Sequence, residues 1–432
     1  MRKRRARWIA GLPIFLSLVA CGASPRPDAP PNIVMIVVDT LRADHLPSYG
    51  YLRDTAPGIS RLAASGVLFE RVIAPSSWTK TSMASIMTGQ LPASHGVLRH
   101  RNALPSRTTT LASRLASQGY RTLGVNTNPW LQAQFGFDAG FDVYETIRHA
   151  KESGVATEVN RRALALLAAS PRDRPVFLYL HFMDVHAPYR ITGVSTAEDA
   201  ALEYAYRKEG LDDPGVQERV IELYDAGIHA LDAELSTLRR ELAAVLPAEE
   251  TLTVLTSDHG EAFREHGNTE HGKDLYPEVL EVPLIFAWPG VLPEGVRVAA
   301  QVRSIDIAPT LLALAQGSVP DSFEGSPLLP LTGHAIEDRL AHSELYFRRP
   351  LDPFHLAAVI SPDHFFVHEK MSGTTEFYDL RADPGAQHDL GGDDPRAARY
   401  AASERSATVI RPAERTLDAG TREELEALGY LK

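Results

Sequence analysis

Three apolar segments of this sequence end abruptly on side chains that carry a carboxylate or an imidazole. The segments cover residues 33–38, 175–180 and 252–256, and the polar groups that follow them are Asp39, His181, and Asp258 with His259. Continuous apolar runs of this length are typical of strands that helices bury on both faces. The residues that follow parallel strands meet at one edge of the sheet, where ligands bind. The sequence therefore predicts an α/β fold with a mainly parallel central sheet, flanked by helices, and a polar site at one edge.

Amphipathic stretches between and after these runs predict the covering helices. They lie at residues 110–118, 158–169 and 217–246, and they alternate with strands as a parallel sheet requires. The polar segment 209–216 predicts a loop before the last of these helices. From about residue 342, short apolar runs separated by turns predict a small antiparallel sheet.

These patterns divide the chain into a main domain and smaller C-terminal parts. We expect the main domain to cover residues 32–335 and a small antiparallel-sheet subdomain to cover 336–395. A polar, helical tail is expected over 396–432.

The N-terminus has the pattern of a bacterial lipoprotein signal. Basic residues fill most of positions 2–7, and the apolar run over 8–20 is too short for an ordinary membrane span. Cys21, the single cysteine, follows as in a lipobox, and a Pro-rich tether occupies 21–31. We expect residues 1–20 to be removed and a lipidated Cys21 to anchor the protein in the bacterial cell envelope, outside the cytoplasm, at the outer membrane or facing the periplasm. The alternative is an ordinary signal peptide with a chance cysteine.

The charge of the chain restricts its partners. The formal net charge is −11 at pH 7, and five of the basic residues belong to the N-terminal signal. A strongly acidic domain repels nucleic acid and offers no polybasic patch to a membrane. We therefore expect no nucleic-acid partner, and attachment to a membrane only through Cys21.

Asp39, Asp258 and His259 form a candidate site for one divalent metal ion. Two carboxylates and an imidazole suit Mn²⁺, Mg²⁺, Ca²⁺ or Zn²⁺. Thr79 would complete the set, because an ion beside a hydroxyl lowers its proton affinity and makes it a nucleophile. Each residue alone has an ordinary explanation as a helix cap or a turn residue. Their common order and spacing favour the metal site.

The segment around Thr79 resembles the nucleophile motif of the sulfatase family. Residues 77–89 end in a Thr-Gly pair, and counting back from that pair places Thr79 where sulfatases have a Cys or Ser that is oxidised to an aldehyde. Thr81 and Met83 stand where that motif has Pro and Arg. The resemblance implies an alkaline-phosphatase-like sandwich with a sulfatase-like catalytic domain, and an unmodified hydroxyl at the nucleophile position.

Further segments are similar to sulfatases, and they cover 92–96, 181–189, 270–276, 304–311 and 376–390. The resemblance implies that His186 binds substrate and that His271 and Lys273 contact the transferred oxyanion. Either histidine could protonate the leaving group. A second metal held by Asp184, His186 or His271 is an open alternative. Residues 193–215 match nothing in the family and are expected to shape the substrate pocket.

Two departures from the sulfatase pattern favour phosphorus chemistry. Asn126 and Asn128 lie in the segment that carries the sulfate-binding Lys and His of the family, and Thr40 stands where a second acidic ligand is common. The remaining Asp, Thr, Asp and His resemble the single-metal, Thr-nucleophile lipoteichoic-acid synthase and phosphoglycerol transferase relatives. The hypothesis is a hydrolase or transferase that cleaves phosphate mono- or diesters of an envelope lipid or glycan through a covalent Thr79 intermediate. A sulfatase without formylglycine and a catalytically inactive anion-binding envelope protein are the alternatives.

Overall fold

The computed structural model describes residues 29–148, 155–191, 193–331, 336–347, 353–404 and 412–427. The predicted signal peptide, Cys21 and most of the predicted tether lie outside the described residues, so the predicted anchor stays a prediction. Within the described ranges, no helix combines the length and the hydropathy that are needed to cross a membrane.

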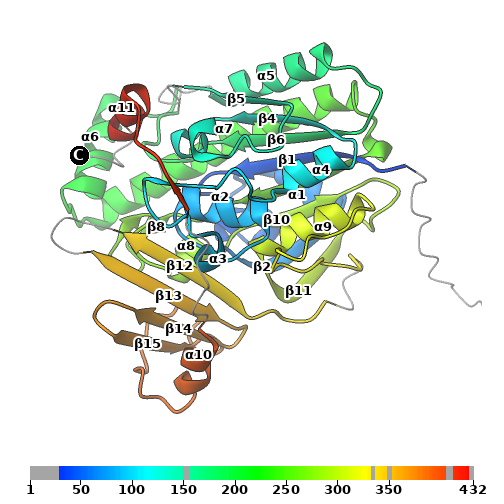
Figure 1. Cartoon of the computed structure of the whole chain (residues 1–432). Coiled ribbons are helices and arrows are strands. Elements are labelled where there is room, and N and C mark those ends of the chain that lie inside the picture. Colours follow the sequence, from blue (N-terminus) through cyan, green and yellow to red (C-terminus); the bar gives the residue numbers. More distant parts are fainter. Residues whose placement is uncertain are drawn as a thin grey trace, which may run out of the picture.

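An eight-stranded sheet forms the centre of the molecule (Figure 1), in the order β11-β2-β10-β7-β1-β6-β4-β5. In chain order the strands are β1 (Asn32–Val38), β2 (Val67–Ile73), β4 (Arg121–Asn126), β5 (Val143–Thr146), β6 (Val176–Phe182), β7 (Thr251–Ser257), β10 (Leu284–Ala287) and β11 (Val296–Arg303). Strand β1 is parallel to both of its neighbours, and β10 is antiparallel to both of its own. The predicted α/β fold with a mainly parallel sheet is confirmed.

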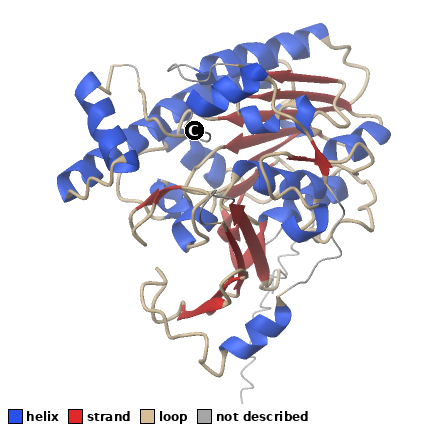
Figure 2. Ribbon diagram, turned by 60° about the vertical axis from the view of Figure 1, so that its left-hand side comes forward, coloured by secondary structure: helices blue, strands red, loops and turns tan. Residues whose placement is uncertain are grey.

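Helices cover both faces of this sheet (Figure 2). The α-helices are α1 (Pro57–Ala64), α2 (Thr79–Thr88), α3 (Pro92–His95), α4 (Leu111–Ser117), α5 (Val155–Ala169), α6 (Ala197–Lys208), α7 (Pro214–Ala243), α8 (Pro277–Leu280), α9 (Ile307–Leu314), α10 (Ala397–Ser403) and α11 (Ala419–Ala427). Short 3-10 turns are η1 (Ala43–His45), η2 (Pro47–Tyr49), η3 (Pro129–Leu131), η4 (Ala133–Phe135), η5 (Ala248–Glu250) and η6 (Ser304–Asp306).

The central strand β1 shows why two helical layers are needed. Its odd-numbered residues from Ile33 to Val37 pack into a core with α2, α4 and α9. Its even-numbered residues from Val34 to Val38 pack into a second core with α1, α5 and α7. Because successive side chains of a strand point to opposite faces, a continuous apolar run has to be covered on both.

The segment before α7 contains more helix than predicted. The expected loop over 209–216 is shorter, because α7 begins at Pro214. Asp213 caps this start, since its carboxylate accepts two backbone amides of the helix at 2.9 and 3.0 Å. The preceding helix, α6, was not predicted, although Thr196 and Asp199 form a capping box at its start.

A small antiparallel sheet follows the main domain, as predicted (lower part of Figure 1). Its strands are β12 (Ala341–Phe347), β13 (Phe354–Ile360), β14 (His364–Glu369) and β15 (Thr374–Asp379), paired in that order. Helix α10 packs on one face through Tyr400 and Phe377, and the other face joins the main core through Phe365 and Tyr378. Two short ladders pair β3 (Asn102–Ala103) with β16 (Ala413–Glu414), and β8 (Ala262–Phe263) with β9 (Thr269–Glu270).

Candidate active site

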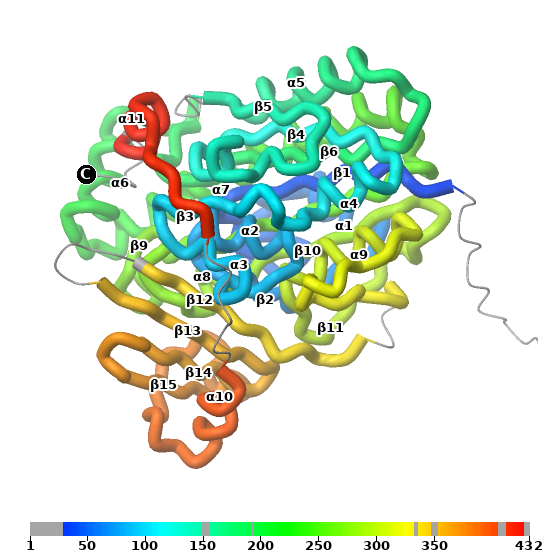
Figure 3. Tube along the Cα trace, in the orientation of Figure 1, coloured from blue at the N-terminus to red at the C-terminus, as the bar shows by residue number. Residues whose placement is uncertain are grey.

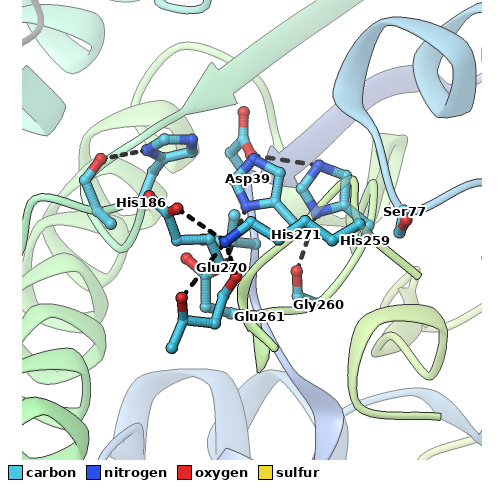
Figure 4. Close-up of polar contacts among 12 residues, drawn as sticks. Asp39, Ser77, His186, His259, Gly260, Glu261, Glu270 and His271 are labelled. Atoms are coloured by element: carbon cyan, nitrogen blue, oxygen red, sulfur yellow. Dashed lines mark hydrogen bonds and ion pairs between the residues drawn. The ribbon is translucent and has the colours of Figure 1, made fainter. Parts of the chain in front are cut away.

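The ends of β1 and β7 bring Asp39, Asp258 and His259 together. These strands are parallel neighbours, so the residues that follow them leave the sheet at the same edge. The three side chains are fully buried, and one ligand-type atom of each lies within 4.8 Å of the others. We call these three residues the Asp-Asp-His group. Figure 4 shows Asp39 and His259 beside two further histidines, His186 and His271.

Thr79 enters the same space from a helix. It is the first residue of α2 and is fully buried; its Oγ1 lies 3.1 Å from Nε2 of His259 and 3.5 Å from Oδ2 of Asp39. Ser82, in the same helical turn, donates to the carbonyl of Asp258 at 2.6 Å and ties α2 to the end of β7. The amides at the start of this ten-residue helix favour an anion. The structure thus brings all four predicted metal ligands together.

The Asp-Asp-His group fits a divalent cation. Among the described residues, Oδ1 of Asp39 and Oδ2 of Asp258 are buried acceptors that receive no hydrogen bond. Nε2 of His259 lies 3.8 Å from the first oxygen and 3.3 Å from the second. Ligand atoms that share one ion lie about 3–4 Å apart, because each is about 2.0–2.6 Å from it. Buried carboxylate oxygens without a donor destabilise a protein unless a cation compensates them.

The protonation states of the group also suit a metal. Nδ1 of His259 lies 2.9 Å from the carbonyl of Gly260 (Figure 4), which can only accept, so Nδ1 carries the proton and Nε2 presents a lone pair. Burial, and then the charge of Asp258, raise the pKa of Asp39 well above its usual value, and burial raises the pKa of Asp258. A divalent ion would reverse this effect, because it favours the charged carboxylates.

Asn128 and His181 close the other side of Asp39. Strand β6 lies next to β1, and β4 lies next to β6, so the ends of all three strands reach the same edge. Nδ2 of Asn128 donates to Oδ2 of Asp39 at 2.7 Å, and Nε2 of His181 lies 3.7 Å from that oxygen. Burial, and then His259 and His186, lower the pKa of His181 to about 3, so its ring is neutral. Asn128 therefore orients Asp39.

The C-terminal segment supports the loop that carries Asn128. Figure 3 shows residues 412–427 returning over the main domain, with α11 near the top of that view. Gln132, directly after η3, donates to Glu424 at 3.2 Å and accepts from the hydroxyl of Thr421 at 2.8 Å. Two residues of α11 therefore hold this loop through Gln132.

His271 and His186 stand in a row with His259. The ring centroid of His271 lies 4.5 Å from that of His259 and 4.9 Å from that of His186. Nδ1 of His271 lies 3.0 Å from a carboxylate oxygen of Glu261, which is fully buried and accepts from the hydroxyl of Tyr189 at 3.0 Å. Burial, and then the histidine neighbours, lower the pKa of His186 to about 3 and that of His271 well below its usual value. Glu261, which holds His271, was missed by the sequence analysis.

Lys273 and Asp184 have partners outside this cluster. The Lys273 ammonium donates to the carbonyl of Thr269 at 2.6 Å and pairs with Glu270 at 3.2 Å. Asp184 accepts the amide of Ala156 at 2.9 Å. In the part of the chain that the structure describes, the Asp-Asp-His group is the only set of three His, Cys, Asp or Glu side chains with the spacing of metal ligands. Among the described residues, neither Lys273 nor Asp184 makes a hydrogen bond with Thr79, and the predicted contact of Lys273 with a transferred oxyanion stays a prediction.

Thr40 has a strained backbone directly after Asp39. Its φ of 61° is in the left-handed region, which a β-branched residue rarely adopts. Its amide donates to Oδ1 of Asp258 at 3.3 Å, and its hydroxyl donates to the carbonyl of Val185 at 3.2 Å. The strained turn thus joins the two carboxylates of the Asp-Asp-His group.

Two sequence-family models match this chain. The model described as Sulfatase matches residues 31–318, which include every residue of the cluster above. The chain belongs to the sulfatase family. As a sulfatase-family protein of the alkaline phosphatase superfamily, it is an ester hydrolase. A second model, described as N-sulphoglucosamine sulphohydrolase, C-terminal, matches residues 265–402, which include the antiparallel sheet.

Relatives of this sulfatase-family protein cover nearly its whole length. Arylsulfatase A of Bos taurus is 26% identical over 457 residues, which cover 89% of this chain and 87% of that protein. The solved structure of a 2-O GAG sulfatase has a TM-score of 0.73 at 20% identity, and covers 86% of this chain and 90% of its own. The phosphonate monoester hydrolase of Agrobacterium radiobacter has a TM-score of 0.72 at 20% identity, and the match covers 92% of this chain and 95% of that one. The last two show a shared fold.

Proposed function

We propose that this sulfatase-family protein hydrolyses or transfers phosphate mono- or diesters through a covalent intermediate on Thr79. The observation that carries the proposal is the position of Thr79 Oγ1, 3.1 Å from Nε2 of His259 and inside the set of predicted ligands. An unmodified hydroxyl suits attack on phosphorus, because water or a second alcohol can open the resulting phosphothreonine ester.

A sulfated threonine would have no comparable route for releasing the sulfate group. The aldehyde hydrate of other sulfatases carries a second hydroxyl, whose deprotonation expels sulfate by elimination, and a threonine carries one hydroxyl. Water would then have to attack the sulfate ester directly. The fold shared with a phosphonate monoester hydrolase is compatible with phosphorus as the reacting centre.

The residues have separable roles in this proposal. A divalent ion held by Asp39, Asp258 and His259 would lower the proton affinity of a neighbouring hydroxyl and offset negative charge on the ester oxygens. Thr79 forms the new bond to phosphorus while the bond to the leaving oxygen breaks. His186 or His271 passes a proton to that leaving oxygen, and an anionic ester beside the two rings favours their protonated forms. Asn128 keeps Asp39 in place.

The substrate is proposed to be an anionic ester of an envelope lipid or glycan. The proposal of an envelope location rests on the lipoprotein pattern around Cys21. Water as the second acceptor makes the protein a hydrolase, and a substrate hydroxyl makes it a transferase.

A sulfuric ester hydrolase without formylglycine is the second candidate. The match of the Sulfatase family over residues 31–318 favours it, as does the 2-O GAG sulfatase that shares the fold. An inactive anion-binding protein is disfavoured, because Asp39, Thr79, Asp258 and His259 are all present and in contact.

The test is turnover of matched aryl esters by the intact protein with added Mn²⁺. Aryl phosphate, aryl phosphodiester and aryl sulfate are compared in the wild type, Thr79→Ala and Thr81→Ala. The Thr81 variant is the matched control, because it also removes a hydroxyl from α2. The Thr81 hydroxyl donates to the carbonyl of Val97 at 2.8 Å and does not contact the Asp-Asp-His group. Acid-quenched protein is examined by mass spectrometry for a phosphoryl group on Thr79.

We expect phosphate or phosphodiester turnover to exceed sulfate turnover and to disappear in Thr79→Ala alone. Faster sulfate turnover would overturn the substrate class. Equal activity of the two threonine variants would overturn the nucleophile. Binding of the esters with no turnover by the wild type would identify an inactive anion-binding protein.

A further inference from the structure

A second polar site lies at the opposite end of the central sheet. Between the amino-terminal halves of β1 and β7 and the helices α1 and α7 there is a cavity of about 340 Å³. Its apolar lining includes Leu242, Ala243 and Pro289, which keep some exposed surface, and the almost fully buried Val34 and Ile36 lie behind them. Its rim carries Arg61, Arg239 and Arg240. Asp39 follows the other end of β1, so this cavity is separate from the candidate active site.

The rim arginines have no carboxylate partner among the described residues. Arg61 and Arg239 make no hydrogen bond or ion pair there, and Arg240 reaches only the hydroxyl of Thr237, at 3.5 Å. Asp232 is close enough to act on the charge of Arg239, but its carboxylate accepts two backbone amides at the start of α1, at 2.7 Å each. The rim is therefore a local cationic site on a chain of net charge −11.

Two of the three rim cations, Arg61 and Arg239, also oppose each other. Burial, and then the charge of Arg61, lower the pKa of Arg239. An anion between the two guanidinium groups would remove this repulsion, and guanidinium binds carboxylate and phosphate through two parallel hydrogen bonds. Cavities of about 300–1,000 Å³ with apolar walls and a few polar groups are typical of small-molecule sites.

We infer that this cavity binds an anionic amphiphile, with its phosphate or carboxylate head between Arg61 and Arg239 and its hydrocarbon chain against Leu242, Ala243 and Pro289. The apolar lining provides for a chain that inorganic phosphate lacks, and each buried CH₂ contributes about 0.8 kcal/mol. The arginine rim gives the site its preference for an anion.

The position of the cavity permits two sources for this ligand. Asn32, the first residue of β1, pairs in register with Thr251, which lines the cavity. The exposed residues Ala29 and Pro30 precede it, so the chain enters the domain on the side of the cavity. A free amphiphile in solution and a lipid of a nearby membrane present the same chemistry.

The test is calorimetric titration of the intact protein with dodecanoate, in the presence of EDTA so that no metal at the Asp-Asp-His group captures the carboxylate. Arg61→Gln with Arg239→Gln removes two of the three rim charges, and Ala243→Phe fills the mouth while it keeps the arginines. The matched control is Arg297→Gln with Arg381→Gln, which changes the net charge equally at two exposed arginines that do not line the cavity.

We expect one dodecanoate to bind per chain, with affinity at least about tenfold lower in both cavity variants and unchanged in the control. Inorganic phosphate should bind at least about tenfold more weakly than dodecanoate. No dodecanoate binding, or equal binding by a rim variant with an unchanged melting temperature, would overturn the inference. Phosphate that binds as tightly as dodecanoate would overturn the hydrocarbon part of the site.

Vesicle flotation separates the two sources. A Cys21→Ser background removes any lipid anchor, and vesicles of phosphatidylglycerol are compared with vesicles of phosphatidylcholine. Retention on phosphatidylglycerol that the rim variant loses supports a membrane lipid as the ligand. Dodecanoate binding without retention on vesicles supports a free amphiphile.

Discussion

Two largely buried histidine–carboxylate clusters of this protein differ in whether their polar atoms have partners. In the Asp-Asp-His group, Oδ1 of Asp39 and Oδ2 of Asp258 receive no hydrogen bond from the described residues. In the second cluster, His266 contacts Glu278 and the carbonyl of Ala386, each at 2.8 Å, and stacks on Tyr276 at 3.7 Å.

This difference distinguishes a site that is built to bind a ligand from one that stabilises the fold. Buried acceptors without donors reduce stability, so a protein keeps them where a ligand will complete them. A histidine whose two ring nitrogens are both paired stabilises the fold, and His266 joins α8 of the main domain to the turn after the antiparallel sheet. Both clusters combine histidine with carboxylate side chains, and they differ in whether these polar atoms have hydrogen-bond partners.

Of the predicted changes, metal removal should have the largest effect, and it should act on ester turnover at the Asp-Asp-His group. Exhaustive chelation should reduce ester turnover at least about 10³-fold, because the charge at Thr79 and at the ester loses its counter-ion. Turnover should return on addition of Mn²⁺ or another divalent ion, which a titration of activity against added metal measures. A His266→Gln variant should respond to chelation as the wild type does. Full activity in protein that elemental analysis shows to be metal-free would contradict the metal site.

Removal of the group that orients Asp39 should have a smaller effect. Asn128→Ala should lower turnover and metal affinity about 10–100-fold, because outer partners of metal ligands tune them to this extent. Steady-state kinetics and metal titration measure the two quantities. Gln134→Ala is the control, since this residue lies on the same loop but bonds to Thr421 at 2.7 Å. Equal losses in both variants would indicate a general loosening of the loop.

Neutralising one carboxylate should change the free energy of unfolding in opposite directions in the two clusters. In metal-free protein, Asp39→Asn should raise the free energy of unfolding by about 1–2 kcal/mol, because it removes one of two buried like charges. Glu278→Gln should lower it, because that carboxylate is already paired with His266. Urea unfolding in EDTA measures both. A loss of stability in Asp39→Asn would show that the Asp-Asp-His group is satisfied without a metal.

The smallest predicted effect depends on pH. Burial alone would lower the pKa of His266, but the hydrogen bond and charge of Glu278 outweigh it and raise the pKa. The protonated ring is therefore the stabilising form. Its contribution is fully present below the unfolded pKa of about 6.5 and is lost as pH rises through the raised folded pKa. His266→Gln should therefore lower the free energy of unfolding by about 1 kcal/mol at about pH 6 and by less at about pH 9, measured by urea unfolding. A pH-independent difference would contradict the assignment.

Local pattern was enough to find the strands and the residues that end them. Asp39, Asp258 and His259 could be singled out because each follows a continuous apolar run, and those runs are β1 and β7. The antiparallel sheet was predictable from its short runs for the same reason. Helix α6 was missed, although the capping box of Thr196 and Asp199 was available as a signal.

The sequence by itself determined which segments are strands, that helices cover both faces of the sheet, and that Thr79 stands where the resemblance to sulfatases places a Cys or Ser. The tertiary structure alone decided that Asn128 reaches Asp39 across β6, that Glu261 holds His271, and that Lys273 turns to Glu270. It also decided that Arg61 and Arg239, far apart in the chain, share one cavity. The physical reason is that periodicity reports the burial of a single segment, whereas the order of strands in a sheet, and therefore which polar ends become neighbours, depends on packing between distant segments.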